Sequence, residues 1–306
     1  MSSHKQIDVT KDIMQQLPGE LVAHIASYAG KKELNNLRLA SYVTEQKSNI
    51  EFAKQSLRPL RINLRVDKGG LGEENTTSLD RFDCSDIEAA IKFIDRNDRS
   101  NFVQDVVIRD VVDYRKFSEF QCCTKPLSPS EDIGSSEAAK LLNTFFSKLT
   151  SLRNVSLCLG WQPSIALIMH VLSCQPQLRL TSLTISHGWF SNVGVISPVL
   201  SLFKQSLRSL HFTRTGMSRR AWRKLFEHIR DDLQIEDFTD ERWIATPQGK
   251  DLIGHLTYSK DVSPNDLQTE SYLIAPLLTS VVMKGRLGVK MGAEKMLELV
   301  EPVWCD

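Results

Sequence analysis

One short pattern, apolar-x-x-apolar-x-apolar, returns along most of the chain and limits the folds open to it. The copies end at Ile62, Ile108, Leu157, Ile185, Phe212 and, in a shorter form, Ile235. The last four of these end points follow one another at closer and more regular intervals than the first three. Those later intervals lie in the range of about 20 to 29 residues that is typical of a repeat architecture in which each repeat adds one strand to a stack. Each copy therefore predicts a β-strand.

Amphipathic helical patterns separate these predicted strands. They cover 86–96, 136–149, 163–174, 196–203 and 218–229. Short units of strand, loop and helix favour parallel strands with the helices on the outer side. Repeated units of this length stack into a curved solenoid, so we predict an α/β fold with an irregular β/α solenoid over 57–245. Residues 246–306, where the repeat fades, are predicted to cap its open end.

Two polar stretches lengthen the early repeats. Residues 66–85 and 116–136 are rich in Gly, Ser, Pro and acidic side chains, which is typical of inserted loops. They are interpreted as surface decoration or, at Ser128 and Pro129, as a regulatory loop that is phosphorylated.

The stretch 17–41 has a different character and predicts short helices. Pro18 is suited to the first helical position, and Gly30 to a left-handed residue just past the helix end. Leu21 and Ile25 recur at helical spacing between them, and further helices are expected after Lys31 and over about 40–57. We predict a polar, disordered segment at 1–12 and a small all-α unit at 13–56 that needs a partner or the rest of the chain for stability.

This stretch resembles the F-box, in the form common in fungal F-box proteins. The matching residues are Leu17, Pro18, Glu20, Leu21, Ile25, Tyr28, Leu34, Leu37, Arg38, Leu39 and Ser41. The resemblance implies docking on the Skp adaptor and, through it, on a cullin-RING ubiquitin ligase. The adaptor contacts that it implies are Leu17, Pro18, Leu21, Ile25, Leu34, Leu37 and Leu39. The alternative is that these apolar residues form only the core of an N-terminal helical hairpin.

An F-box-like start followed by irregular repeats resembles the leucine-rich-repeat F-box proteins, which use the repeats to hold a ubiquitylation target. The implied function is the substrate-recognition subunit of an SCF-type ubiquitin ligase, bound to a target protein that the sequence does not identify. The alternative is a leucine-rich-repeat interaction scaffold with no link to ubiquitin.

Two groups of residues are candidates for target binding. On the concave face the strand pattern nominates Ser156, Thr184, Ser186, His211, Thr213, Gln234 and Glu236. Near the strand ends it nominates a rim of Trp161, His187, Trp189, Phe190, Arg214 and Trp243. Exposed aromatic residues and arginine are typical of interface hot spots, although the tryptophans would also serve as wedges between repeats.

Other function classes find no support in the motifs. GxSxG, GxxxxGK[ST], HExxH and GxGxxG are absent from the sequence, so no catalytic residues are nominated and the chain is not expected to be an enzyme. The six cysteines form no CxxC pair, and His187 and His211 have no evident third ligand, so neither a metal nor a cofactor is expected. The arginine-rich helix at 218–229 is followed by acidic residues, which favours a solvated outer face over nucleic-acid binding.

Charge and hydropathy point the same way. Lysine and arginine number 38 against 37 acidic residues, so no overall field attracts nucleic acid or a membrane surface. The sequence also contains neither a signal-peptide core nor a run of about 18 apolar residues. We expect a cytoplasmic or nuclear protein, or one found in both compartments.

Overall fold

The computed structural model describes residues 16–57, 59–66, 82–111, 133–160, 162–187, 189–190, 193–217, 219–241, 271–274 and 280–300. The chain divides into two compact units, residues 1–60 and 61–306. The predicted loops at 66–85 and 116–136, and the predicted disordered start at 1–12, lie wholly or largely outside the described residues. Each unit is described by itself.

The N-terminal unit is helical, as predicted. Its helices are α2 (Gly19–Tyr28), α3 (Lys31–Ala40) and α4 (Tyr42–Ser56), and α2 and α3 each pack against α4. Lys47 Nζ donates to the carbonyl of Leu17 at 2.6 Å, and Gln55 Nε2 donates to the carbonyl of Ala29 at 3.0 Å. These two bonds join the two ends of α2 to points about two turns apart along α4, so the two helices run in the same direction.

The expected roles of Pro18 and Gly30 are wrong in detail. Pro18 is the residue before α2, with φ −53° and ψ 146°, and not its first helical residue. Gly30 has φ −67° and ψ 168°, which is extended backbone, and its carbonyl accepts from Leu34 N at 2.8 Å. Gly30 therefore begins α3. The next helix follows α2 so closely that no left-handed turn is needed between them.

Ser41 caps the start of α4. Its Oγ accepts from Thr44 N at 3.1 Å and lies 2.7 Å from Thr44 Oγ1. We expect Ser41→Ala to lower the free energy of unfolding of this unit by about 1 kcal/mol, because the amide loses its acceptor. Ser27→Ala is the control, since Ser27 is exposed within α2 and donates only to the carbonyl of His24. Denaturant titration followed by circular dichroism compares the two variants, and equal stability would contradict the cap.

The second unit is α/β and contains an open, mostly parallel sheet with strand order β10-β11-β9-β7-β5-β4-β3-β1-β2. Its strands are β1 (Leu60–Val66), β2 (Phe82–Asp83), β3 (Asp105–Val111), β4 (Asn154–Cys158), β5 (Ser182–Ser186), β7 (Ser209–Thr213), β9 (Asp237–Glu241), β10 (Ser271–Ile274) and β11 (Ser280–Lys284). The strands from β3 through β9 in this order run parallel, whereas β2, β10 and β11 pair antiparallel with their neighbours. Two short strands, β6 (Trp189–Phe190) and β8 (Gly216–Met217), pair parallel to each other.

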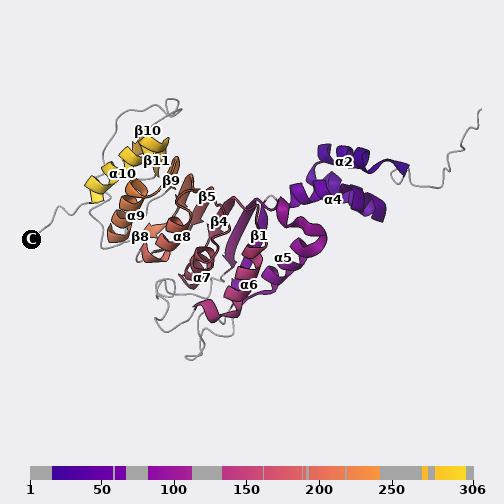
Figure 1. The fold of residues 1–306 in the computed structure, drawn as a ribbon, viewed down its shortest axis with the longest axis horizontal. Helices are drawn as coiled ribbons and strands as arrows, with labels where there is room; N and C mark the ends of the chain where they lie inside the picture. The colour runs from indigo at the N-terminus through magenta and orange to yellow at the C-terminus, as the bar shows by residue number, and fades with distance from the viewer. Residues whose placement is uncertain are drawn as a thin grey trace, which may run out of the picture. The chain divides into compact units, whose positions relative to one another are not determined.

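The helices of this unit lie side by side along one face of the sheet (Figure 1). They are α5 (Ser85–Asp95), α6 (Glu137–Ser147), α7 (Gln162–Ser173), α8 (Ser197–Leu202), α9 (Arg219–Asp231) and α10 (Arg286–Val300), with 3-10 turns at Arg96–Phe102, Ile133–Ser135 and Val193–Val195. The five predicted helical ranges agree closely at both ends with α5 through α9. The remaining helix, α10, packs against α9.

Strand alternation separates the buried from the uncovered face of the sheet. In β4, β5 and β7 the second and fourth residues are buried and the others are half-exposed. The buried set extends into the helices, where Trp222 stacks on Phe226 at 5.6 Å between ring centroids and meets Phe212 edge-on at 5.7 Å. The core therefore lies between the sheet and its single layer of helices.

The strand predicted around Ile235 is wrong in register. Phe212 of β7 pairs with Asp240 of β9, so the strand begins two positions after Ile235. Leu157, Ile185, Phe212 and Asp240 are then equivalent residues of neighbouring strands, and their sequence numbers are almost evenly spaced. The apolar rule missed this strand because a buried aspartate, Asp240, stands where the other three strands carry an apolar residue.

Candidate functional site

Large apolar side chains of α2 are exposed to solvent. Leu21, Ile25 and Tyr28 are 49%, 46% and 80% exposed, while Val22 and Ala26 of the same helix are fully buried. Spacings of four and three place the exposed residues on one face of α2. The helix thus buries its smaller apolar residues and presents its larger ones, an arrangement that the burial of a core alone does not explain.

Further exposed apolar residues occur where α3 gives way to α4. Leu39 is 85% exposed and Tyr42 is 71% exposed. Ile50 is also exposed, two turns along α4 from Tyr42, and Gln46 between them donates to the Tyr42 hydroxyl at 2.7 Å. The N-terminal unit therefore exposes large apolar side chains both on α2 and around the start of α4.

The predicted adaptor residues fall into separate environments. Pro18, Leu21, Ile25 and Leu39 are exposed, and Leu17 and Leu37 are half-buried. Leu34 is fully buried, so its expected place on the contact surface is wrong and it belongs to the core. The sequence did not signal Tyr28, Tyr42 and Ile50 as exposed, because an apolar residue at helical spacing is compatible with either side of a helix.

Polar contacts occur both between α3 and α4 and within α4. Arg38 lies over the Phe52 ring at 3.6 Å and donates to Glu45 at 2.8 Å, which ties the end of α3 to α4. Thr44 and Ser48, both buried, lie on the inner side of α4, where Ser48 Oγ donates to the Thr44 carbonyl at 2.7 Å. The contacts between α3 and α4 thus combine hydrogen bonds with a small buried core, whereas Leu21, Ile25 and Leu39 lie exposed outside that core.

The uncovered face of the sheet carries small polar side chains in register. Ser156, Thr184, His211 and Thr239 are successive partners across β4, β5, β7 and β9. His211 Nε2 lies 3.6 Å from Asp237 Oδ2, and Lys284 Nζ lies 2.5 Å from Asp237 Oδ1. The face is therefore rich in hydroxyl groups, with a charged cluster toward β9 and β11.

Some concave-face predictions do not match this register. Ser156, Thr184, Ser186, His211 and Thr213 lie on the uncovered side of their strands. Gln234 and Glu236 precede β9, and the residue that stands in register with His211 is Thr239 instead. His187 and His211 do not form a pair, because Thr184 is the strand partner of His211.

The predicted rim is only partly assembled from described residues. His187 and Arg214 are exposed at the ends of β5 and β7. Phe190 is buried within the unit, so its expected exposure is wrong, and its pairing with Met217 in the small sheet explains why. Trp161 and Trp243 lie outside the described residues, and for Trp189 only the backbone in β6 is described.

One cysteine lies on the uncovered face, at the end of β4. Cys158 is half-buried, and burial raises the pKa of its thiol, which Asp110 also raises while Arg109 opposes the shift. A raised pKa keeps the thiol protonated near neutral pH, so Cys158 is a weak nucleophile. Within the described ranges, no group of three or more potential ligands could hold a metal ion.

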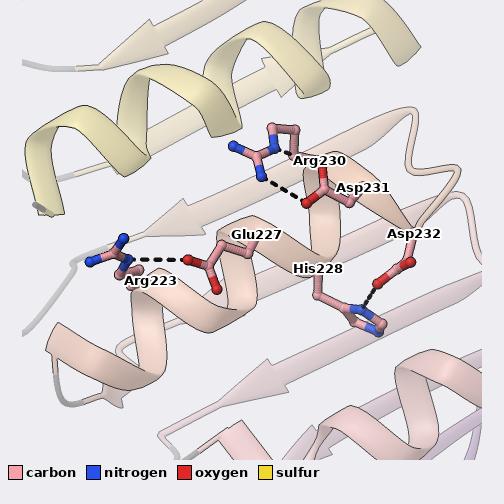
Figure 2. A network of polar contacts seen from close by, with 6 residues as sticks. All are labelled: Arg223, Glu227, His228, Arg230, Asp231 and Asp232. Atoms are coloured by element: carbon pink, nitrogen blue, oxygen red, sulfur yellow. Dashed lines mark hydrogen bonds and ion pairs between the residues drawn. The ribbon is translucent and has the colours of Figure 1, made fainter.

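Charged and polar side chains of α9 form separate pairs that point to different sides of the helix (Figure 2). Arg223 Nε donates to Glu227 at 3.1 Å, and Arg230 donates to Asp231 at 2.7 Å. His228 Nδ1 lies 2.6 Å from Asp232 Oδ2, and its Nε2 lies 3.4 Å from Ser201 Oγ of α8. A groove of about 830 Å³ runs past this array.

Ser201, His228 and Asp232 lie in series, as the residues of some nucleophilic catalytic sites do. Ser201, however, stands near the carboxyl end of the short helix α8, where the helix dipole disfavours negative charge on the serine oxygen. Asp232 is exposed, so solvent screens its effect on His228. The sequence did not reveal this contact, since Ser201 and His228 belong to different helices that are far apart along the chain. These three residues therefore form a surface hydrogen-bond network rather than a site in which the Ser201 hydroxyl is activated as a nucleophile.

Comparisons with known proteins add no family. A scan against protein-family models gave no match, and a search of curated proteins gave none either. Every helix in the part of the chain that the structure describes is too short or too polar to cross a membrane. Two surfaces of the described residues are the candidates for function, the apolar face of α2 and the uncovered face of the sheet.

Proposed function

We propose that this chain is the substrate-recognition subunit of an SCF-type ubiquitin ligase. In this proposal the N-terminal helical unit docks on the Skp adaptor and through it on the cullin, while the second unit binds the protein to be ubiquitylated. The proposal assigns recognition to the chain and leaves ubiquitin transfer to the ligase, so the chain is not an enzyme.

The exposure of Leu21 and Ile25 is the observation that carries the proposal. Both residues belong to the F-box-like pattern of the sequence, and both are about half exposed although they are large and apolar. Large apolar patches on a monomer mark interaction sites. If these residues were only the core of a helical hairpin, they would be buried like Leu34.

We also propose that the second unit is a leucine-rich-repeat-like solenoid. Support comes from the nearly even spacing of the equivalent strand positions Leu157, Ile185, Phe212 and Asp240, and from the helices gathered on one side of parallel strands. The same spacing supports the second candidate function, an interaction scaffold without a ligase link. The two candidates differ in what the apolar face of α2 does.

Direct binding to the adaptor tests the proposal. We expect the purified full chain and a purified Skp adaptor to form a one-to-one complex in size-exclusion chromatography with light scattering, and cullin to join that complex. Isothermal titration calorimetry supplies the dissociation constant. An intact, folded chain that does not bind the adaptor at micromolar concentration would sink the ligase proposal and leave the scaffold.

A further inference from the structure

The carboxyl ends of parallel strands bring two unusual residues to the same edge of the sheet. His187 follows β5 and Arg214 follows β7, and their preceding residues, Ser186 and Thr213, are strand partners. His187 N donates to the carbonyl of Thr213 at 2.9 Å, which fixes the two turns against each other. The same turn thus recurs at equivalent positions of neighbouring strands.

Both residues hold backbone conformations that favour glycine. His187 has φ 64° and Arg214 has φ 52°, in the left-handed region where a Cβ atom crowds the following carbonyl. Glycine would adopt this conformation without that crowding. Two exposed side chains in such positions of equivalent turns are therefore candidates for a functional role.

The surroundings of these residues supply donors for an anionic group. Arg109 is exposed on β3 in the same cross-strand row as Ser186 and Thr213. Among the residues that the structure describes, neither Arg109 nor Arg214 takes part in an ion pair, and the Ser186 and Thr213 hydroxyls make no hydrogen bond.

Acidic residues also occur along this edge. Asp110 of β3 accepts from Gly160 N at 3.1 Å, so its carboxylate is engaged with the backbone. Glu241 of β9 is the strand partner of Thr213, and only its backbone is described. The binding surface inferred below therefore extends from Arg214 toward β3, away from β9.

We propose that Arg109, Ser186, His187, Thr213 and Arg214 form an acidic-peptide rim that binds a segment carrying aspartate or glutamate side chains. Each guanidinium presents several donors to a carboxylate, and the two hydroxyls add neutral donors between them. The inference deepens the proposed function, since the acidic segment would belong to the target protein. It is tested without the Skp adaptor, so that either proposal can fail alone.

Peptide selection on the full chain tests the rim. A random library of short peptides is displayed on phage and selected on the immobilised protein, and we expect the recovered peptides to be enriched in aspartate and glutamate. The best peptide is then synthesised with a fluorescent label, with its acids intact, with the acids changed to amides, and with serine phosphate in their place. Only the carboxylate form is expected to bind with full affinity.

Substitutions of single arginines test whether the selected peptide binds at the acidic-peptide rim. Arg214→Gln and Arg109→Gln are each expected to weaken the selected peptide about tenfold to a hundredfold, as for a lost charged hydrogen bond. Arg220→Gln is the matched control, because Arg220 is an exposed arginine on α9 and not on the uncovered face. Three results would overturn the inference: no enrichment of acids, full binding of the amide peptide, or equal weakening by Arg220→Gln. Stronger binding of the phosphate form would transfer the site to phosphorylated segments and overturn the carboxylate assignment.

Glycine substitution separates binding from folding. Arg214→Gly and His187→Gly should leave the thermal unfolding midpoint unchanged or higher, because the strain is relieved, and should weaken the peptide. Thr184→Gly is the control in an extended strand position, where glycine is expected to lower the midpoint. A fall in the midpoint of Arg214→Gly as large as that of the control would mean that the side chain holds the fold, and would refute its role in binding.

Discussion

Changing Leu21 and Ile25 together to aspartate is expected to abolish binding to the Skp adaptor and to leave the chain folded. Both side chains are about half exposed, so the free protein tolerates a carboxylate there. In a complex the same carboxylates would lose water without gaining a partner. Apolar anchors of an interface each contribute about 2–4 kcal/mol, so the dissociation constant should rise about a thousandfold or more. Titration calorimetry of the purified proteins measures it.

Two control variants make this outcome specific. Asn35→Asp with Asn36→Asp adds the same charge at exposed polar positions of α3, and this variant should bind the adaptor nearly as well as the natural sequence. Leu34→Asp places a carboxylate at a fully buried position, and it should unfold the N-terminal unit. Far-ultraviolet circular dichroism and thermal denaturation of each variant separate a lost contact from a lost fold.

The scaffold alternative makes the opposite prediction for the same residues. If the apolar face of α2 were an internal packing surface, the double aspartate variant would lose helical signal and stability as Leu34→Asp does. A variant that remains folded and keeps full adaptor affinity would exclude Leu21 and Ile25 from the contact. Either result would reassign the exposed face to another partner or to the fold.

Sequence periodicity identified the three helices that the structure describes in the first unit, but not which face of α2 is buried. Leu21 and Ile25 stand one helical turn apart, and so do Val22 and Ala26, so either pair fits the inner face of a helix. Size argues for burial of the larger pair, yet the structure buries the smaller one. The contacts among the helices decide which of the two pairs is buried. These contacts depend on α4, which begins only at Tyr42.

In the second unit, strand and helix order could be predicted because each repeat alternates apolar residues with a fixed period. The prediction failed at Asp240, where a buried acidic residue occupies a strand position that is apolar in the neighbouring strands. It also failed at Phe190, which belongs to a short strand within what was expected to be a loop. The left-handed turns at His187 and Arg214 were also not predicted, because histidine and arginine adopt a positive φ much less often than glycine does. Such departures from local rules are often found at functional or strained positions.

Trp222→Ala is expected to lower the free energy of unfolding of the second unit by about 3–5 kcal/mol, as for other large aromatic residues removed from a core. Trp222 is 1% exposed and belongs to an aromatic cluster with Phe212, Phe226 and Phe238. Neighbours from α9, β7 and β9 surround it, so the cavity left behind cannot be closed by one moving side chain. Urea denaturation followed by circular dichroism measures the change.

Arg223→Ala is the matched control on the same helix, since Arg223 is half-exposed and its pair with Glu227 lies in solvent. A change within about 0.5 kcal/mol is expected there. Trp222→Ala should also keep its affinity for the Skp adaptor under conditions where both units remain folded, because the exposed face of α2 belongs to the other compact unit. Loss of adaptor binding in a folded Trp222→Ala protein would show that the second unit contributes to that contact, whereas equal stability of Trp222→Ala and the natural chain would contradict the aromatic core.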